Sequence, residues 1–66
     1  MILGEKIKLI RKKFGLSQDE LGAKLNVSRQ AITKWETGKG TPDVENLRAI
    51  SAILNISIDY LISNSR

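Results

Sequence analysis

Apolar residues recur along this chain at spacings of three and four within short segments, which is the pattern of amphipathic helices. The first segment places four of them on one helix stripe, at Leu3, Ile7, Ile10 and Phe14. Lysines occupy other positions around the same helix, at Lys6, Lys8, Lys12 and Lys13. We expect this helix to end near Gly15, because glycine readily adopts the backbone conformation that ends helices.

A capping box predicts the start of a second helix. The hydroxyl of Ser17 is expected to accept from the amide of Glu20, and the Glu20 carboxylate reaches back to the amide of Ser17. This helix is predicted to run to about Leu25, with Leu21 and Leu25 on its inner face. Asn26 follows, and its side chain tolerates the left-handed conformation, so we expect the helix to end there.

A third helix is predicted over residues 29–37, with Ser28 as its cap and Gly38 as its stop. Ile32 and Trp35 share its inner face, and we expect Trp35 to belong mainly to the core. Only about three residues separate the second and third helices, which forces a sharp turn and leaves the third helix projecting from the body.

The rest of the chain predicts two further helices. One begins near Pro42 or Asp43 and ends at about Leu54, before a second Asn stop; its apolar positions are Val44, Leu47, Ile50 and Leu54. A short helix over residues 58–63 follows, with Ser57 as cap and Leu61 inward.

Residues 53–58 are rich in β-branched side chains and would also suit a strand, but the chain offers no second strand to pair with it. We therefore predict an all-α fold. It is a compact five-helix domain over residues 1–66, in which the second and third helices form a helix-turn-helix.

Composition narrows the chemistry. The 66 residues include no cysteine and no histidine, which excludes disulfides, Cys/His zinc sites, cysteine nucleophiles and histidine bases. We expect no metal and no cofactor, and the fold must rest on its own apolar core. No apolar run approaches the ~18 residues of a membrane span, and charges follow the N-terminus at once. A cytoplasmic protein without a membrane partner is the expectation.

Charge is distributed unevenly along the chain. Residues 1–41 hold nine basic residues against four acidic ones, whereas residues 42–66 hold two against three. Such a basic region favours a polyanionic partner, although excess lysine also serves as a solubilising surface. The outer face of the third helix carries hydrogen-bonding side chains, at Arg29, Gln30, Thr33 and Lys34. Arg and Lys read guanine and Gln reads adenine in the DNA major groove, so this face suits base recognition.

The run GLSQDELGAKLNVSRQAITKWETG, residues 15–38, closely resembles the signature of the Cro/XRE family of helix-turn-helix DNA-binding proteins. The resemblance covers residues 4–62 and includes the Gly-Lys-Gly-Thr-Pro loop. It implies a lambda-repressor-like fold and a sequence-specific regulator of transcription, expected to be a repressor. It also implies a homodimer on a double-stranded DNA operator, with the third helix in the major groove.

The resemblance also implies residue roles. Base-reading positions match Arg29, Gln30, Thr33 and Lys34, and phosphate-binding positions match Gln18, Ser28, Lys39 and Thr41. The position of Gln18 in this family also supports a neighbouring recognition residue. Arg11 and Glu36 match a partly buried structural ion pair. The chain departs from the family pattern at Gly22, which usually is Ala, and at Asn26, which usually is Gly; a glycine inside a helix costs roughly 1 kcal/mol.

Three alternatives stay open or weak. The apolar residues of the fifth helix, Ile58, Tyr60 and Ile62, are either a dimer interface or ordinary surface. An enzyme is not expected, because most carboxylates sit at helix starts, where they complement the dipole. A protein-interaction or antitoxin-like module with the same fold, in which DNA binding is secondary or absent, is the serious competitor.

Overall fold

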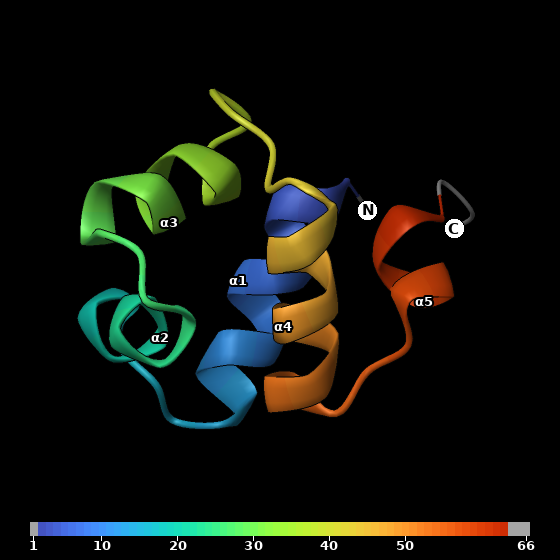
Figure 1. Cartoon of the computed structure of the whole chain (residues 1–66), viewed down its shortest axis with the longest axis horizontal. Coiled ribbons are helices and arrows are strands. Elements are labelled where there is room, and N and C mark those ends of the chain that lie inside the picture. Colours follow the sequence, from blue (N-terminus) through green and yellow to red (C-terminus); the bar gives the residue numbers. More distant parts are fainter. Residues whose placement is uncertain (1, 64–66) are drawn as a thin grey trace.

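The computed structural model of the protein describes residues 2–63, which form five α-helices and no strand (Figure 1). The helices are α1 (Leu3–Lys13), α2 (Gln18–Leu25), α3 (Arg29–Glu36), α4 (Val44–Leu54) and α5 (Ile58–Ile62). All five predicted helices are present, and the third and fifth each end one residue earlier than predicted. In Figure 1, α2 and α3 lie at one end of the molecule and α5 at the other, with α1 and α4 between them.

The predicted capping box of Ser17 and the predicted stops at Asn26 and Asn55 are confirmed. The Ser17 hydroxyl accepts from the Glu20 amide at 3.0 Å, and the Ser17 amide donates to Glu20 Oε1 at 2.7 Å. This hydrogen bond from the Ser17 amide lowers the pKa of the Glu20 carboxyl below its usual value. Asn26 and Asn55 end α2 and α4 in the left-handed conformation, with φ of 60° and 54°. Each of these signals is local, which is why the sequence contained it.

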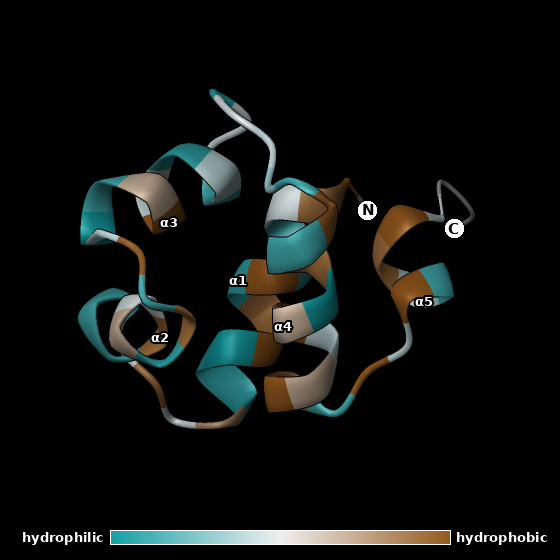
Figure 2. Cartoon of the chain, in the orientation of Figure 1, coloured by the Kyte–Doolittle hydropathy of each residue, from teal (hydrophilic) through white to brown (hydrophobic). Residues whose placement is uncertain are grey.

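The core draws apolar side chains from all five helices. Its buried members are Ile7, Leu21, Leu25, Ile32, Trp35, Ile50, Leu54 and Leu61. Trp35 and Leu61 are therefore core residues, as predicted. Figure 2 shows hydrophobic and hydrophilic residues alternating along the helices as the ribbons turn, which is how each helix presents one face to this core. In the described part of the chain, no helix is long and apolar enough to cross a membrane.

The predicted apolar stripes of α1 and α4 each include one residue, at one end of the helix, that is not part of the core. Phe14 is 53% exposed and Val44 is 63% exposed, although both fall at helical spacing with core residues. Phe14 is the C-cap of α1 and Val44 is the first residue of α4, so each lies at a helix end beyond the reach of the other helices. Spacing alone extends a stripe to the end of a helix, whereas packing stops where the neighbouring element stops.

Lys6 departs from its predicted position in the opposite sense, because it is buried. The prediction from sequence places Lys6 off the apolar stripe, elsewhere around the first helix, but the residue is only 3% exposed. Its Nζ donates to the carbonyl oxygens of Tyr60, at 2.7 Å, and of Ser63, and lies 4.9 Å from the centroid of the Tyr60 ring. The ammonium group thus satisfies carbonyls at the end of α5 and fastens α5 to α1.

Two glycines allow backbones to approach closely. A Cβ on Gly4 would lie 2.2 Å from the carbonyl oxygen of Trp35, so only glycine lets the first turn of α1 rest on the end of α3. A Cβ on Gly22 would lie 2.8 Å from the carbonyl oxygen of Val27. The propensity cost expected for Gly22 is therefore offset by the room that it gives the turn between α2 and α3.

Candidate nucleic-acid interface

The turn between α2 and α3 is held from within α2. The Val27 amide donates to the Gly22 carbonyl at 2.8 Å, and Ser28 begins α3 by accepting from the Ala31 amide at 3.2 Å. Only three residues therefore separate the end of α2 from the first turn of α3, which carries Arg29 and Gln30, both exposed. This arrangement leaves the N-terminal end of α3 free to enter a groove.

The outer face of α3 is polar and exposed along its whole length. The exposed side chains are Arg29, Gln30, Thr33, Lys34 and, at the C-cap, Thr37. Arg29 Nε lies 3.9 Å from a carboxylate oxygen of Asp19 on α2, with side chains 62% and 76% exposed. No local sequence pattern indicates this pair. At that distance and exposure it is a weak interaction that leaves the guanidinium available to another acceptor.

The loop after α3 is fastened to the helix by its backbone. The amides of Lys39 and Gly40 both donate to the Lys34 carbonyl, at 2.8 and 3.2 Å. Gly38 adopts a φ of 78°, which a residue with a side chain would adopt only under strain. Lys39 and Thr41 are exposed on this loop. The loop therefore holds Lys39 next to the C-terminal end of α3.

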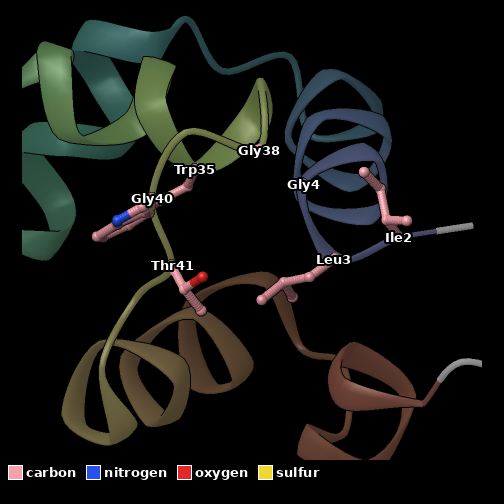
Figure 3. Close-up of a pocket in the computed structure, with 7 residues that line it drawn as sticks. All are labelled: Ile2, Leu3, Gly4, Trp35, Gly38, Gly40 and Thr41. Carbon is pink, nitrogen blue, oxygen red and sulfur yellow. The ribbon is translucent and has the colours of Figure 1, made fainter.

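A small hollow lies between this loop and the start of α1 (Figure 3). Its volume is about 170 Å³, and it is lined by Ile2, Leu3, Gly4, Trp35, Gly38, Gly40 and Thr41. Leu3 and Thr41 point toward one another in Figure 3. Pockets for small molecules usually exceed about 300 Å³ and carry convergent polar groups, so this hollow does not fit a cofactor.

The predicted ion pair between Arg11 and Glu36 is present and buried. Arg11 Nε donates to Glu36 Oε2 at 2.6 Å and Arg11 Nη2 to Oε1 at 3.1 Å, while Nη1 donates to the Leu16 carbonyl at 2.8 Å. The two side chains are 8% and 2% exposed. This bidentate pair joins the end of α1 to the last residue of α3, so it fixes α3 against the core.

Gln18 extends this ion pair to the surface. Its Nε2 donates to Glu36 Oε1 at 3.0 Å, and its Oε1 accepts from the Thr33 hydroxyl at 3.0 Å. Gln18 thus contacts Thr33, one of the residues for which the resemblance implies a base-reading role. The sequence alone does not indicate the link to Glu36, because the partners lie 18 residues apart and no local pattern connects them.

The predicted dimer residues Ile58, Tyr60 and Ile62 are all exposed on α5. Leu9 on α1, which lies off the stripe of Leu3, Ile7 and Ile10, is a further exposed apolar residue. In the part of the chain that the structure describes, no cluster of acidic, cysteine or histidine side chains could hold a metal ion.

A protein family, two curated relatives and a solved structure all match this chain over most of its length. The helix-turn-helix family matches residues 7–61. The HTH-type transcriptional activator BcrR of Enterococcus faecalis is 44% identical over 63 residues, which make up 96% of this chain and 31% of that protein. The repressor protein C2 of Salmonella phage P22 is 43% identical over 61 residues, which make up 92% of this chain and 28% of that protein. The crystal structure of the P22 c2 repressor in complex with a synthetic operator matches with a TM-score of 0.92 at 40% identity, covering 98% of each chain.

Proposed function

This chain belongs to the helix-turn-helix family, of Cro/C1 type, and its fold is that of the phage repressor domains; from this premise we propose that it binds double-stranded DNA in a sequence-specific manner. The observation that carries the proposal is the exposed N-terminal turn of α3 on a fold that matches a repressor bound to its operator. An α-helix fits the major groove of B-DNA, and the first turn of a recognition helix meets the base edges.

Four exposed side chains on α3 read bases in this proposal: Arg29, Gln30, Thr33 and Lys34. Arg29 suits guanine and Gln30 suits adenine, because each can form two hydrogen bonds to the edge of that base. The exposed, weakly paired state of Arg29 supports the assignment, since leaving Asp19 costs the guanidinium little.

Phosphate contacts come from Gln18, Ser28, Lys39 and Thr41 in the same proposal. Ser28 caps α3 through its oxygen, so its hydroxyl proton stays available for a phosphate oxygen. Gln18 uses one Nε2 hydrogen for Glu36 and has a second one to offer. Lys39, held beside the end of α3, supplies positive charge without base specificity.

We also propose that two copies assemble on the operator through α5. The exposed Ile58, Tyr60 and Ile62 lie at the opposite end of the molecule from α2 and α3 in Figure 1, so an interface there leaves α3 uncovered. A two-fold pair presents two recognition helices to successive major grooves, about 34 Å apart. The test is the stoichiometry by sedimentation on the selected duplex. One subunit per site, or normal assembly of a Tyr60→Ala, Ile62→Ala variant, contradicts the interface; Leu9→Ala is the control.

The biological role that we propose is transcription regulation, as a repressor. The relatives are transcription regulators and not enzymes, and they include both a repressor and an activator. The chain spans about a third of the length of these two relatives. We therefore propose residues 1–66 as a single DNA-binding domain, described here over residues 2–63, and attribute to it the DNA recognition alone.

The decisive experiment selects binding sites for the 66-residue chain from a pool of random duplexes. Recovered sequences should share a two-fold motif, and log K for that motif should fall with log[salt] at a slope near −0.9 per neutralised phosphate between about 50 and 200 mM. If no sequence is enriched and binding does not depend on salt, the DNA-binding proposal fails. Tight binding to a protein partner in that case would favour a protein-interaction or antitoxin-like module.

A further inference from the structure

The hydroxyl of a threonine can donate or accept a hydrogen bond, so a recognition threonine normally pairs with either kind of base edge. In this protein the free structure already determines whether the Thr33 hydroxyl donates or accepts, because Thr33 belongs to a series of hydrogen bonds that begins in the core. The direction of each bond in that series follows from the chemistry of the groups.

The series of hydrogen bonds begins at Arg11, whose guanidinium can only donate. It donates through Nε and Nη2 to the two carboxylate oxygens of Glu36, at 2.6 and 3.1 Å. Both Glu36 oxygens accept from the guanidinium in this buried, bidentate pair, so both act as acceptors.

Glu36 then determines the orientation of the Gln18 amide. Because Glu36 Oε1 acts as an acceptor, the group that faces it at 3.0 Å must be the NH₂ end of the amide. The oxygen end therefore faces Thr33, with Gln18 Oε1 3.0 Å from Thr33 Oγ1. An amide oxygen also only accepts, so the Thr33 hydroxyl must donate its single proton to Gln18.

We propose that Thr33 reads the major groove as a hydrogen-bond acceptor only, and that its partner is an exocyclic amino group, N6 of adenine or N4 of cytosine. The inference rests on the proposed function, in which α3 enters the major groove. Adenine N6 and cytosine N4 are the donors that base edges present there, whereas guanine O6, thymine O4 and purine N7 accept. Phosphate oxygens also accept, so the committed hydroxyl does not suit a phosphate contact.

This assignment predicts an unusual kind of base preference. At the position facing Thr33, adenine and cytosine on the contacted strand should be favoured together over guanine and thymine, since the latter place a carbonyl opposite the lone pairs of Oγ1. A hydroxyl that was free to rotate would distinguish amino and carbonyl edges much less.

The test starts from the site that the unmodified chain selects. Thr33→Val removes the hydroxyl and keeps the shape, and the operator position at which it relaxes selection is the position facing Thr33. The affinity of the Thr33→Val variant for the selected duplex should fall about two- to tenfold, the range of one hydrogen bond. Thr33→Ser, which keeps the hydroxyl, should retain the preference. Thermal melts of each variant confirm that it folds.

Two duplex analogues then separate the donor and acceptor assignments. Removing the amino group at that position, with purine for adenine or 2-pyrimidinone for cytosine, should abolish the difference between the chain and its Thr33→Val variant. Removing a purine N7, with a 7-deaza base, should leave the difference intact. In Gln18→Met the Thr33 proton is released, so discrimination between amino and keto bases should narrow even though affinity for all duplexes falls.

Each other result overturns the inference in an identifiable way. If the Thr33→Val penalty disappears with the 7-deaza base, Thr33 donates. If the penalty is equal on selected and random duplexes, Thr33 contacts the backbone. If Gln18→Met leaves the amino preference unchanged, Gln18 does not set the polarity. If the unmodified chain selects no duplex at all, the proposed function itself fails.

Discussion

Glu36→Gln should destabilise the protein by about 3–5 kcal/mol, the usual cost of leaving one charge of a buried pair without its partner. The substitution keeps the shape of the side chain but removes the charge that faces Arg11, whose side chain is 8% exposed. A chain of 66 residues has a total stability of about 3–10 kcal/mol, at about 0.05–0.15 kcal/mol per residue. The single substitution therefore brings the domain close to unfolding.

Removing both charges should cost much less than the two single changes together. In the double variant Arg11→Met, Glu36→Leu no charge is stranded, and apolar replacements of buried pairs are often neutral or stabilising. The Gln18 amide reaches the surface, where water can replace its lost partner, so the main remaining cost is about 1–3 kcal/mol for the Leu16 carbonyl. We therefore expect the double variant to be more stable than Glu36→Gln.

The assay is urea unfolding followed by far-UV circular dichroism and by the fluorescence of Trp35, which is buried. Coincident transitions would establish two-state behaviour and allow the free energies to be compared. In thermal melts, each 1 kcal/mol corresponds to about 4–8 °C for a domain of this size. The matched control is Asp19→Asn, which removes the exposed pair with Arg29 and should cost less than about 1 kcal/mol.

Two results would refute this reasoning. One is a loss in Glu36→Gln as small as that in Asp19→Asn, which would mean that the buried pair is no more important than a surface pair. The other is a loss that disappears in about 1 M salt, where the Debye length is about 3 Å, because screening of that kind affects exposed charges far more than buried ones.

Three further outcomes test other parts of the molecule. Lys39→Ala should weaken binding to all duplexes alike and reduce the slope of log K against log[salt] by up to about 1. Arg29→Ala should cost about 1–3 kcal/mol of binding free energy and relax the preference at one base position. Equal losses on specific and random DNA would contradict the base-reading role of Arg29. Lys6→Met should speed amide hydrogen exchange in α5 by removing the donor to two carbonyls, while the exposed Lys8→Met should not; unchanged exchange would mean that Lys6 does not hold α5. Glu20→Gln should be less stable than the unmodified chain at pH 7, and this difference in stability should disappear on acidification. The pKa of Glu20 in the folded state lies below its usual value of 4.5. The carboxylate therefore contributes stability above pH 4.5 that is lost as the pH falls through the folded pKa. Urea midpoints between pH 7 and 3 measure this difference, and a difference independent of pH would contradict it.

The helix boundaries could be predicted because they depend on neighbours in the sequence. Ser17 and Glu20 lie three residues apart and satisfy each other at the start of α2. Asn26 and Asn55 end their helices through their own backbone preference. None of these interactions needs knowledge of where the other helices lie.

Lys6 was misplaced because its residue type outweighed its position. Leu3, Lys6, Ile7 and Ile10 form an i, i+3, i+4, i+7 set, so helical spacing already put Lys6 inside the apolar stripe. A buried lysine needs acceptors for its ammonium group, and these come from the far end of the chain, at Tyr60 and Ser63. Only the tertiary arrangement supplies that information.

The candidate interface was predicted as a set of residues but not as a network. Resemblance to a family gave Arg11 with Glu36, and both partners are found together. The roles of the base-reading and phosphate-binding residues stay predictions. The bonds that join Gln18 to Glu36 and to Thr33 span 18 and 15 residues, and they depend on the crossing of α2 and α3, which the sequence pattern does not specify.

The hydrogen bonds that run from Arg11 through Glu36 and Gln18 to Thr33 contribute unequally to the stability of the fold. At the core end, breaking the pair of Arg11 and Glu36 costs an amount comparable to the whole stability of the domain. At the outer end, the bond between Gln18 and Thr33 is exposed and contributes on the order of 1 kcal/mol. If Thr33 reads a base as proposed, base preference can therefore change through Gln18 or Thr33 while the fold persists, whereas a change at Arg11 alone strands Glu36 and removes the fold before it alters the preference. Variants selected for a new operator should accordingly carry substitutions at the outer two positions and retain the inner pair.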